Sequence, residues 1–252
     1  MKLSRWIPLV PFAIIILLME FLVRSKMIPN YLLPSPTEIL KAFTEDSADL
    51  WKAAGETGLS ALLGYLGSAT LGLLLGIIFS STRWIENAFY PYAIFFQTVP
   101  IIAIAPLLVI WFGYGMPTII ICTLIVSIFP IIASTLDGIR STDHALIDLF
   151  KIYHARPLQK LFKLSLPFAL PQIFVGLRIS AGLAVIGAIV GEFIAGGGLG
   201  GIIDVARVRQ RVDQVFAAVL LASAIGLIFV AGINLIASFA LRHWHPSKKY
   251  AK

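Results

Sequence analysis

The sequence predicts an all-α integral membrane protein with about six transmembrane helices. Hydrophobic residues make up 58% of the 252 residues and charged residues only 13%, roughly half of the charged share of an average soluble protein. The hydrophobic residues fall in blocks long enough to cross a bilayer, and no polar segment between them is long enough to fold by itself. Residues 1–252 are therefore expected to form a single transmembrane domain.

Cysteine usage and charge narrow the class of protein further. Cys122 is the only cysteine and lies inside a hydrophobic block, so no intrachain disulfide can form. A formal net charge of +7 would be typical of a nucleic-acid-binding protein if the chain were soluble. In a chain this hydrophobic, basic residues near a membrane surface explain it, and no nucleic-acid partner is expected.

Residues 1–30 are predicted to form an N-terminal anchor helix. The run from Ile7 to Val23 is about the shortest stretch that crosses a core of ~30 Å at 1.5 Å per residue. A cleaved signal peptide is the alternative. Pro8, Pro11 and Glu20 are unusual in the core of such a peptide and no small-x-small cleavage site follows, which favours a retained anchor.

Residues 31–55 are polar enough to leave the membrane and are predicted to form an extracytoplasmic interfacial segment. Ser35, Pro36 and Glu38 read as an N-cap, a first-turn proline and the acid of a capping box. A short helix lying along the membrane interface is expected to follow.

Residues 56–242 are predicted to form a core of five further spans. The first is rich in small residues, including Gly64, Gly67 and Gly72, which indicates close packing against neighbouring helices. The five blocks are approximately Thr57–Phe79, Phe89–Phe112, Thr118–Leu136, Pro171–Ala195 and Val215–Leu241.

The second of these spans is expected to be kinked or broken, because Pro91, Pro100 and Pro106 interrupt it. A break at membrane depth is tolerated only where protein or water satisfies the freed backbone groups. Gln97, Thr98 and Pro100 are therefore predicted to line a translocation pathway.

Arg178 and Glu192 are the ionisable residues deepest in the later spans. Fourteen residues apart on one helix, they would lie within ~40° of the same face but ~21 Å from each other, so they cannot pair directly. Two interpretations remain open. The residues can snorkel or pair with neighbours near the ends of the span, or they can line the pathway or a gate.

No nucleotide, metal or catalytic site is expected on this chain. Gly196, Gly198 and Gly201 match a dinucleotide-binding motif, but that motif works only in a βαβ unit, so a glycine-rich turn between helices is predicted. A phosphate-binding loop of the Gly-x-x-x-x-Gly-Lys-Ser/Thr type is missing from the sequence, and so is any metal-ligand spacing or Ser/His/Asp set. The chain is therefore predicted not to be an enzyme.

Residues 140–170 form a long polar, basic interruption and are expected to be a functional loop. Ser141 or Thr142 can cap a first helix, and Pro157 can end it and open a second. The spacing i, i+3, i+4, i+7 gives the first helix one apolar stripe. Such a helix can lie on lipid headgroups or dock on a soluble partner. The stripe consists of Leu146, Leu149, Phe150 and Tyr153.

This loop resembles the cytoplasmic loop of ABC importer permeases. The signature of that loop is Glu-Ala-Ala, three residues, Gly, nine residues, Ile, one residue and Leu-Pro. Placing the Leu-Pro at residues 166–167 sets His154 at the Gly position and Asp148, Leu149 and Phe150 at the Glu-Ala-Ala. The spacing is kept, while the Gly and both Ala are replaced.

Three further segments resemble permeases of the nitrate, sulfonate and taurine branch of ABC importers, and also permeases for thiamine precursors and riboflavin. They are YLLPSPTEIL, QTVPIIAIAPLLVIWFGYG and LPFALPQIFVGLRISAGLAVIGAIVGEFIAGGGLG. The resemblance implies a type I ABC importer permease fold and a small solute such as a sulfonate, taurine, nitrate or a vitamin precursor such as a pyrimidine.

The resemblance also implies partners. The chain would form a homodimer with two ABC ATPase subunits, which bind ATP and Mg, and with an extracytoplasmic solute-binding protein. No cofactor is implied on this chain itself. The loop would supply the coupling helix to the ATPase. The positions that match are Asp148, Leu149, Phe150, Tyr153, His154 and Ala155.

Six spans would place both termini on the same side of a bacterial inner membrane. With both termini cytoplasmic, the inside segments hold twelve Lys and Arg residues and the outside segments seven, which the positive-inside rule favours. A secondary transporter or channel driven by an ion gradient is the alternative function. An intramembrane enzyme is disfavoured because the sequence contains no catalytic set.

Overall fold

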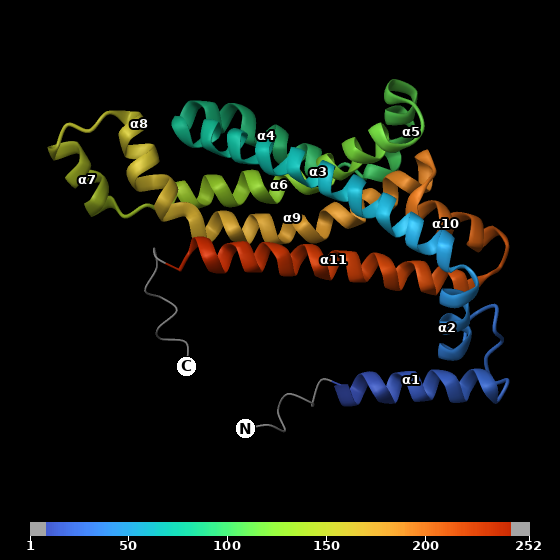
Figure 1. Ribbon diagram of the computed structural model, residues 1–252. Coiled ribbons are helices and arrows are strands. Elements are labelled where there is room, and N and C mark those ends of the chain that lie inside the picture. The colour runs from blue at the N-terminus through green and yellow to red at the C-terminus, as the bar shows by residue number, and fades with distance from the viewer. Residues whose placement is uncertain (1–8, 243–252) are drawn as a thin grey trace.

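The computed structural model describes residues 9–242, and all its regular elements are helices (Figure 1). This confirms the predicted all-α membrane class. The elements are α1 (Leu9–Arg24), α2 (Pro36–Glu45), α3 (Ser47–Ser81), α4 (Arg83–Thr98), α5 (Ile101–Phe112), α6 (Met116–Arg140), α7 (His144–Ile152), α8 (Pro157–Lys160), a π-helical turn η2 (Leu161–Ser165), α9 (Leu166–Ala195), α10 (Gly198–Val208) and α11 (Val212–Ala240).

The centre of the fold is a bundle of α3, α6 and α9, with α11 lying along α9 (Figure 1). Glycines on α3 let α6 approach closely, as the small residues of the first core span predict. A Cβ atom added at Gly72 would lie 2.9 Å from Cβ of Ile131, closer than real Cβ contacts allow. Ser127 on α6 also donates a hydrogen bond of 2.9 Å to the hydroxyl of Ser68 on α3.

Four helices of the described part are long and apolar enough to cross a membrane, namely α3, α6, α9 with the turns before it, and α11. The helices α4 and α5 together form a fifth candidate, bent by 98° at the break between them. α1 supplies 16 residues of the predicted anchor, and the beginning of that anchor lies outside the described residues. The end of α11 lies at the end of the bundle that carries α7 and α8, and α1 runs beneath the opposite half of the bundle (Figure 1).

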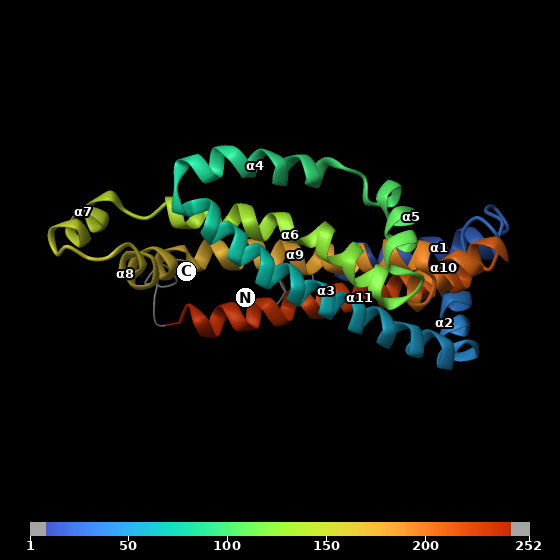
Figure 2. The ribbon, with the colours of Figure 1, turned by 90° about the horizontal axis from the view of Figure 1, so that it is seen from above.

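The break between α4 and α5 confirms that the second core span is interrupted. Val99 is extended, with φ −74° and ψ 123°, as expected for a residue before proline, and Pro100 is the N-cap of α5. Pro91 and Pro106 lie inside α4 and α5, so only one of the three prolines breaks the span. α4 runs along one flank of the bundle and α5 lies across its end (Figure 2).

The predicted capping box of α2 is present. The hydroxyl of Ser35 accepts a hydrogen bond of 3.2 Å from the backbone N–H of Glu38, and the Glu38 carboxylate accepts one of 2.8 Å from the Ser35 N–H. Glu20 of α1 accepts hydrogen bonds from the N–H and the hydroxyl of Thr37, at 3.2 and 3.0 Å. α1 is therefore attached to the rest of the protein through the first turn of α2.

Candidate functional site

The loop between α6 and α9 projects beyond the end of the bundle, and α7 stands clear of the other helices in both views (Figures 1 and 2). Asp143 caps α7, accepting a hydrogen bond of 2.8 Å from the N–H of Ala145. The prediction that Ser141 or Thr142 caps this helix was wrong. Their hydroxyls donate instead to the carbonyls of Gly138 and Ile139 at the end of α6. Pro157 opens α8 as predicted.

The apolar stripe of α7 is largely uncovered. Leu149 is 45% exposed and Tyr153 77% exposed, while Phe150 is half-buried. None of the residues of α7 is buried. Apolar side chains gathered on one exposed helix, outside the spans, are typical of a surface that another protein covers.

His154 follows α7 with φ at +51°, in the left-handed region that favours glycine. The N–H of Ala155 bonds to the carbonyl of Phe150 at 3.0 Å, and the N–H of His154 bonds to the carbonyl of Lys151 at 2.9 Å. This pair of bonds is a Schellman motif with His154 at the position that glycine usually takes. Histidine therefore adopts a left-handed turn here, at the position that matches the Gly of the loop signature.

Asp148, at the Glu position of that loop signature, lies on the exposed surface of α7. Its carboxylate accepts a hydrogen bond of 2.8 Å from the ammonium of Lys151, one turn further along. This bond and the positive charge lower the pKa of the Asp148 carboxyl, so Asp148 is ionised at neutral pH and presents a negative charge.

The predicted pathway residues Gln97, Thr98 and Pro100 lie at the break between α4 and α5, and all three are exposed. Gln97 borders a cavity of about 530 Å³ between these two helices and the bundle. The rest of its lining is almost entirely apolar and includes Phe96 and Trp111.

Arg178 and Glu192 occupy different environments on α9. Arg178 lies near the middle of the helix, is exposed, and has no ion-pair partner in the described part of the chain. Glu192 is 1% exposed. The structure therefore leaves Arg178 facing outward from its own chain and encloses Glu192 within it.

Glu192 belongs to a buried junction where α3 and α9 cap the start of α10. The N–H of Gly200 donates to Glu192 at 2.8 Å, and the Thr57 hydroxyl donates to the same carboxylate oxygen at 3.0 Å. The N–H of Leu199 donates to the Thr57 hydroxyl at 2.9 Å, and that of Gly198 to Glu56 at 3.1 Å. Three N–H groups that a helix start leaves without intrahelical partners are satisfied by side chains from other helices.

The glycine-rich segment before α10 is a turn between helices, as predicted. Gly196, Gly197 and Gly198 all have φ between +57° and +87°. A Cβ atom at Gly198 would overlap the Glu192 carboxylate, and one at Gly200 would lie 2.6 Å from Cβ of Glu192. The glycines therefore allow the backbone to close around this carboxylate.

Sequence reasoning did not identify Glu56 and Thr57 as parts of this junction. They lie more than 130 residues from their partners in the chain. The only local signal was an acidic residue close before a glycine-rich turn, and this signal does not name the partner helix.

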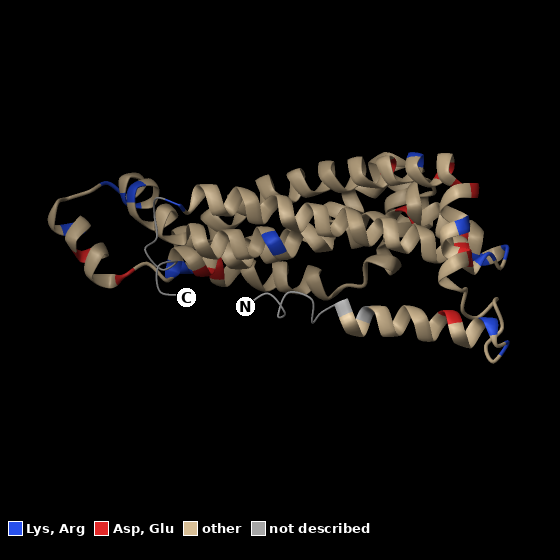
Figure 3. Ribbon diagram, turned by 60° about the horizontal axis from the view of Figure 1, so that its bottom comes forward, with Lys and Arg blue, Asp and Glu red and all other residues tan. Residues whose placement is uncertain are grey.

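Charged residues gather at the two ends of the bundle (Figure 3). In the described part, the end with α7 and α8 holds seven Lys or Arg and four Asp or Glu, while the opposite end holds seven and nine. The end that carries the loop is therefore positive and the opposite end slightly negative.

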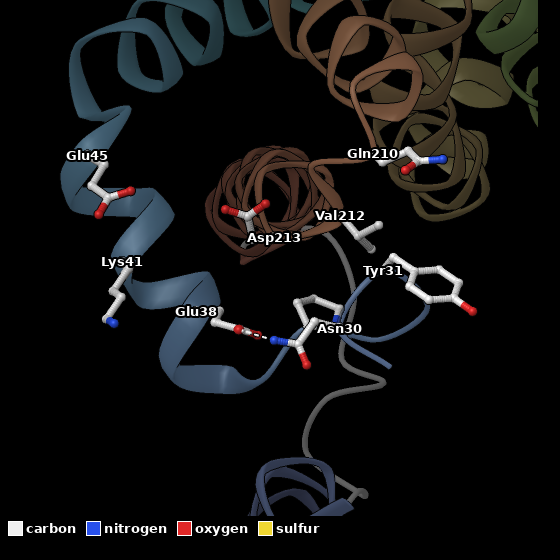
Figure 4. Close-up of a pocket in the computed structure, with 9 residues that line it drawn as sticks. Asn30, Tyr31, Glu38, Lys41, Glu45, Gln210, Val212 and Asp213 are labelled. Atoms are coloured by element: carbon white, nitrogen blue, oxygen red, sulfur yellow. Dashed lines mark hydrogen bonds between the residues drawn. The ribbon is translucent and has the colours of Figure 1, made fainter. Parts of the chain in front are cut away.

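A second cavity of about 530 Å³ opens at that opposite end, between the segment before α2 and the start of α11 (Figure 4). Its charged lining residues are Glu38, Lys41, Glu45 and Asp213, and Asp213 is ion-paired with Arg211 at 2.8 Å. The cavity is a polar surface rich in hydrogen-bonding groups at this end of the bundle.

Comparison with known proteins places the chain among membrane transport subunits. Residues 68–250 match the family described as binding-protein-dependent transport system inner membrane component. The chain therefore belongs to this family, the permease subunits of ABC importers.

Relatives agree over most of the chain. A probable ABC transporter permease protein of Haemophilus influenzae is 35% identical, with 93% of this chain and 96% of that protein covered. The formylaminopyrimidine transport permease protein ThiX of Halalkalibacterium halodurans is also 35% identical, with 84% and 85% covered. The putative aliphatic sulfonates transport permease protein SsuC of Bacillus subtilis is 29% identical, with 93% and 86% covered.

The solved structure of the MetNI methionine ABC transporter, in an inward facing conformation, shares the fold. The TM-score is 0.64 at 17% identity, and the match covers 77% of this chain and 95% of the transporter chain. The predicted type I ABC importer permease fold is confirmed.

Replacing His154 by glycine is expected to stabilise the turn after α7. Glycine adopts positive φ without the steric cost of a Cβ atom, a difference of about 1 kcal/mol. Hydrogen exchange of the α7 amides should slow by roughly fivefold in His154→Gly and accelerate in His154→Val, whose branched side chain opposes this conformation. Equal exchange in wild type and both variants would contradict the assigned turn.

Replacing Glu192 by leucine is expected to destabilise the protein by about 2–4 kcal/mol, because Thr57 and the N–H of Gly200 lose a buried acceptor. Glu192→Gln keeps an oxygen acceptor and should lose much less. Unfolding of the purified chain in mixed detergent micelles, followed by tryptophan fluorescence, measures both variants. If the Glu192→Leu and Glu192→Gln variants were equally stable, the carboxylate would not be the cap of α10.

Proposed function

We propose that the chain is the solute-conducting subunit of an ATP-driven importer, with ATP and Mg bound by a separate ATPase that docks on the loop between α6 and α9. The observation that carries the proposal is the uncovered apolar stripe of α7, which ends in a Schellman turn where the family's loop has glycine. Membership of the binding-protein-dependent family supports the importing direction.

The coupling surface is proposed to comprise one face of α7 and the turn after it. Leu149, Phe150 and Tyr153 would enter an apolar groove of the ATPase, as amphipathic helices do. The negative charge of Asp148 would lie beside this face. His154 and Ala155 would hold the turn that sets the angle of the helix.

The pathway is proposed to run between two copies of the chain, along Gln97, Thr98, Pro100 and Arg178. An unpaired arginine at the centre of a bilayer costs roughly 2.5–3.5 kcal/mol or more when it faces lipid. Its exposure on α9 is therefore best explained by a water-filled path or a second copy on that face. Glu192 would act at the same pathway from within, by holding the end of α9 to α10.

The orientation is proposed to be both termini in the cytoplasm, with α7 and α8 on that side. Over the full sequence, the segments that this orientation places inside hold twelve Lys and Arg residues against seven outside, which supports it. The opposite end, with the polar cavity of Figure 4, would then face the solute-binding protein.

The solute is proposed to be small and polar. Relatives are described as permeases for formylaminopyrimidine, riboflavin and aliphatic sulfonates. These solutes do not all carry the same charge. We therefore propose that the binding protein which delivers the solute also selects it.

A Phe150→Asp, Tyr153→Asp double variant is expected to lose the ATPase, because two charges cannot enter an apolar groove without a large desolvation cost. The measurement is co-purification of the full chain in detergent with a candidate ABC ATPase. Val208→Asp, a change of the same kind at an exposed position of α10, should retain the ATPase.

The outcome that would refute docking on α7 is retention of the ATPase by the double variant. If no ATPase bound even the wild type, and the chain alone in liposomes moved solutes along an ion gradient, the function would be that of a secondary transporter.

Cysteine labelling tests the pathway without knowledge of the solute. In the assembled complex, Gln97→Cys and Thr98→Cys should react with a water-soluble maleimide in the nucleotide-free or the ATP-bound state. Leu227→Cys, on an exposed apolar face of α11, should remain unlabelled. The single native cysteine, Cys122, is buried and sets the background. If both variants were labelled no more than the Cys122 background in both states, positions 97 and 98 would not line the pathway.

A further inference from the structure

A cavity of about 730 Å³ lies between the turn that joins α3 to α4 and the projecting loop. It is open to the surrounding medium. Neither the docking of α7 nor the proposed pathway gives this cavity a role. The residues that line it are Ser80, Ser81, Thr82, Arg83, Asn87, Arg140, His144, Ile147 and Lys160.

The lining is cationic and carries hydrogen-bond donors. Arg83 and Lys160 have no ion-pair partner among the described residues, and Lys160 is half-buried. Arg140 is paired with Glu86, which leaves the two other cations uncompensated. The cavity therefore has a net positive charge and is suited to an anion.

The start of α4 adds to this charge. Thr82 caps the helix by accepting a hydrogen bond of 3.3 Å from the N–H of Ile85. The first N–H groups of α4, from Arg83 onward, carry the positive end of the helix dipole next to the cavity. A phosphate placed here would meet two side-chain cations and a helix start together.

The depth of the cavity is that of lipid headgroups. Ser81, Arg83 and Arg140 are terminal residues of α3, α4 and α6, and the ends of spanning helices lie where the hydrocarbon core gives way to headgroups. Trp84, next to Arg83, is 74% exposed, as is typical of the aromatic residues that lie at this interface.

We propose that this cavity binds the phosphate of an anionic phospholipid headgroup between Arg83 and Lys160. The phosphate would bridge the start of α4 and α8, so the bound lipid ties the projecting loop to the spans. A lipid is favoured over an acidic side chain of a soluble partner, because the cations belong to the ends of the spans and lie beside Trp84 rather than on the exposed stripe of α7. The site requires only that α3, α4 and α6 cross the membrane and does not depend on ATP-driven import.

The test is native mass spectrometry of the full chain, purified in detergent and titrated with phosphatidylglycerol or phosphatidylcholine. The wild type should bind phosphatidylglycerol preferentially. An Arg83→Gln, Lys160→Gln double variant should lose roughly tenfold or more of this preference, since each cation near an anionic headgroup contributes about 1 kcal/mol. The matched control, Arg156→Gln with Lys163→Gln, removes the same charge from the loop outside the cavity and should keep the preference.

Three results would overturn the proposal. Equal loss in both double variants would indicate diffuse attraction to the basic end. Displacement of phosphatidylglycerol by inorganic phosphate, at matched ionic strength with chloride, would indicate a site for free phosphate. Loss of ATPase co-purification in Arg83→Gln, Lys160→Gln with unchanged lipid binding would assign the cavity to the ATPase. In contrast, loss of lipid preference with the ATPase retained would support the lipid site alone.

Discussion

The close approach of α3, α6 and α9 through glycine positions is the constraint on which the rest of the structure depends. Gly64, Gly72 and Gly76 on α3 face α6, and Gly187 on α9 faces α6 from the other side, each with no space for a Cβ atom. Between membrane helices packing replaces the hydrophobic effect as the main attraction, so such contacts decide which helices are neighbours. Because α3 and α9 lie against the same helix, the first part of α3 meets the end of α9, and side chains of both can cap α10.

The projecting loop shows that a residue other than glycine can hold a left-handed turn at the end of a helix. The position after α7 requires a left-handed backbone, because two hydrogen bonds turn the chain back on the last carbonyls of the helix. Glycine meets this requirement at the least cost, yet His154 adopts it with φ at +51°. The turn at His154 therefore fixes how the chain leaves α7.

Features set by neighbouring residues could be predicted from the sequence, and features set by distant residues could not. The capping box of Ser35 and Glu38 and the break at Pro100 follow from local backbone chemistry. The cap of α7 was assigned to the wrong residue, because Ser141, Thr142 and Asp143 are all good caps and the choice depends on where α6 ends. The junction of Thr57 with Glu192 joins residues 135 positions apart, and no periodicity in either helix indicates the other.

The two charged residues of α9, Arg178 and Glu192, lie in opposite environments. One carboxylate oxygen of Glu192 accepts hydrogen bonds from Thr57 and from the N–H of Gly200, so Glu192 ties the end of α9 to the start of α10. Arg178 lies fourteen residues earlier, exposed and without a partner in the described chain, at a depth where lipid cannot solvate its charge. A single copy in lipid would leave this charge uncompensated, whereas a second copy or a water-filled path would supply its counter-charge or hydration. One chain thus exposes a charge at Arg178 and apolar groups on the stripe of α7, and it leaves an apolar cavity beside Gln97.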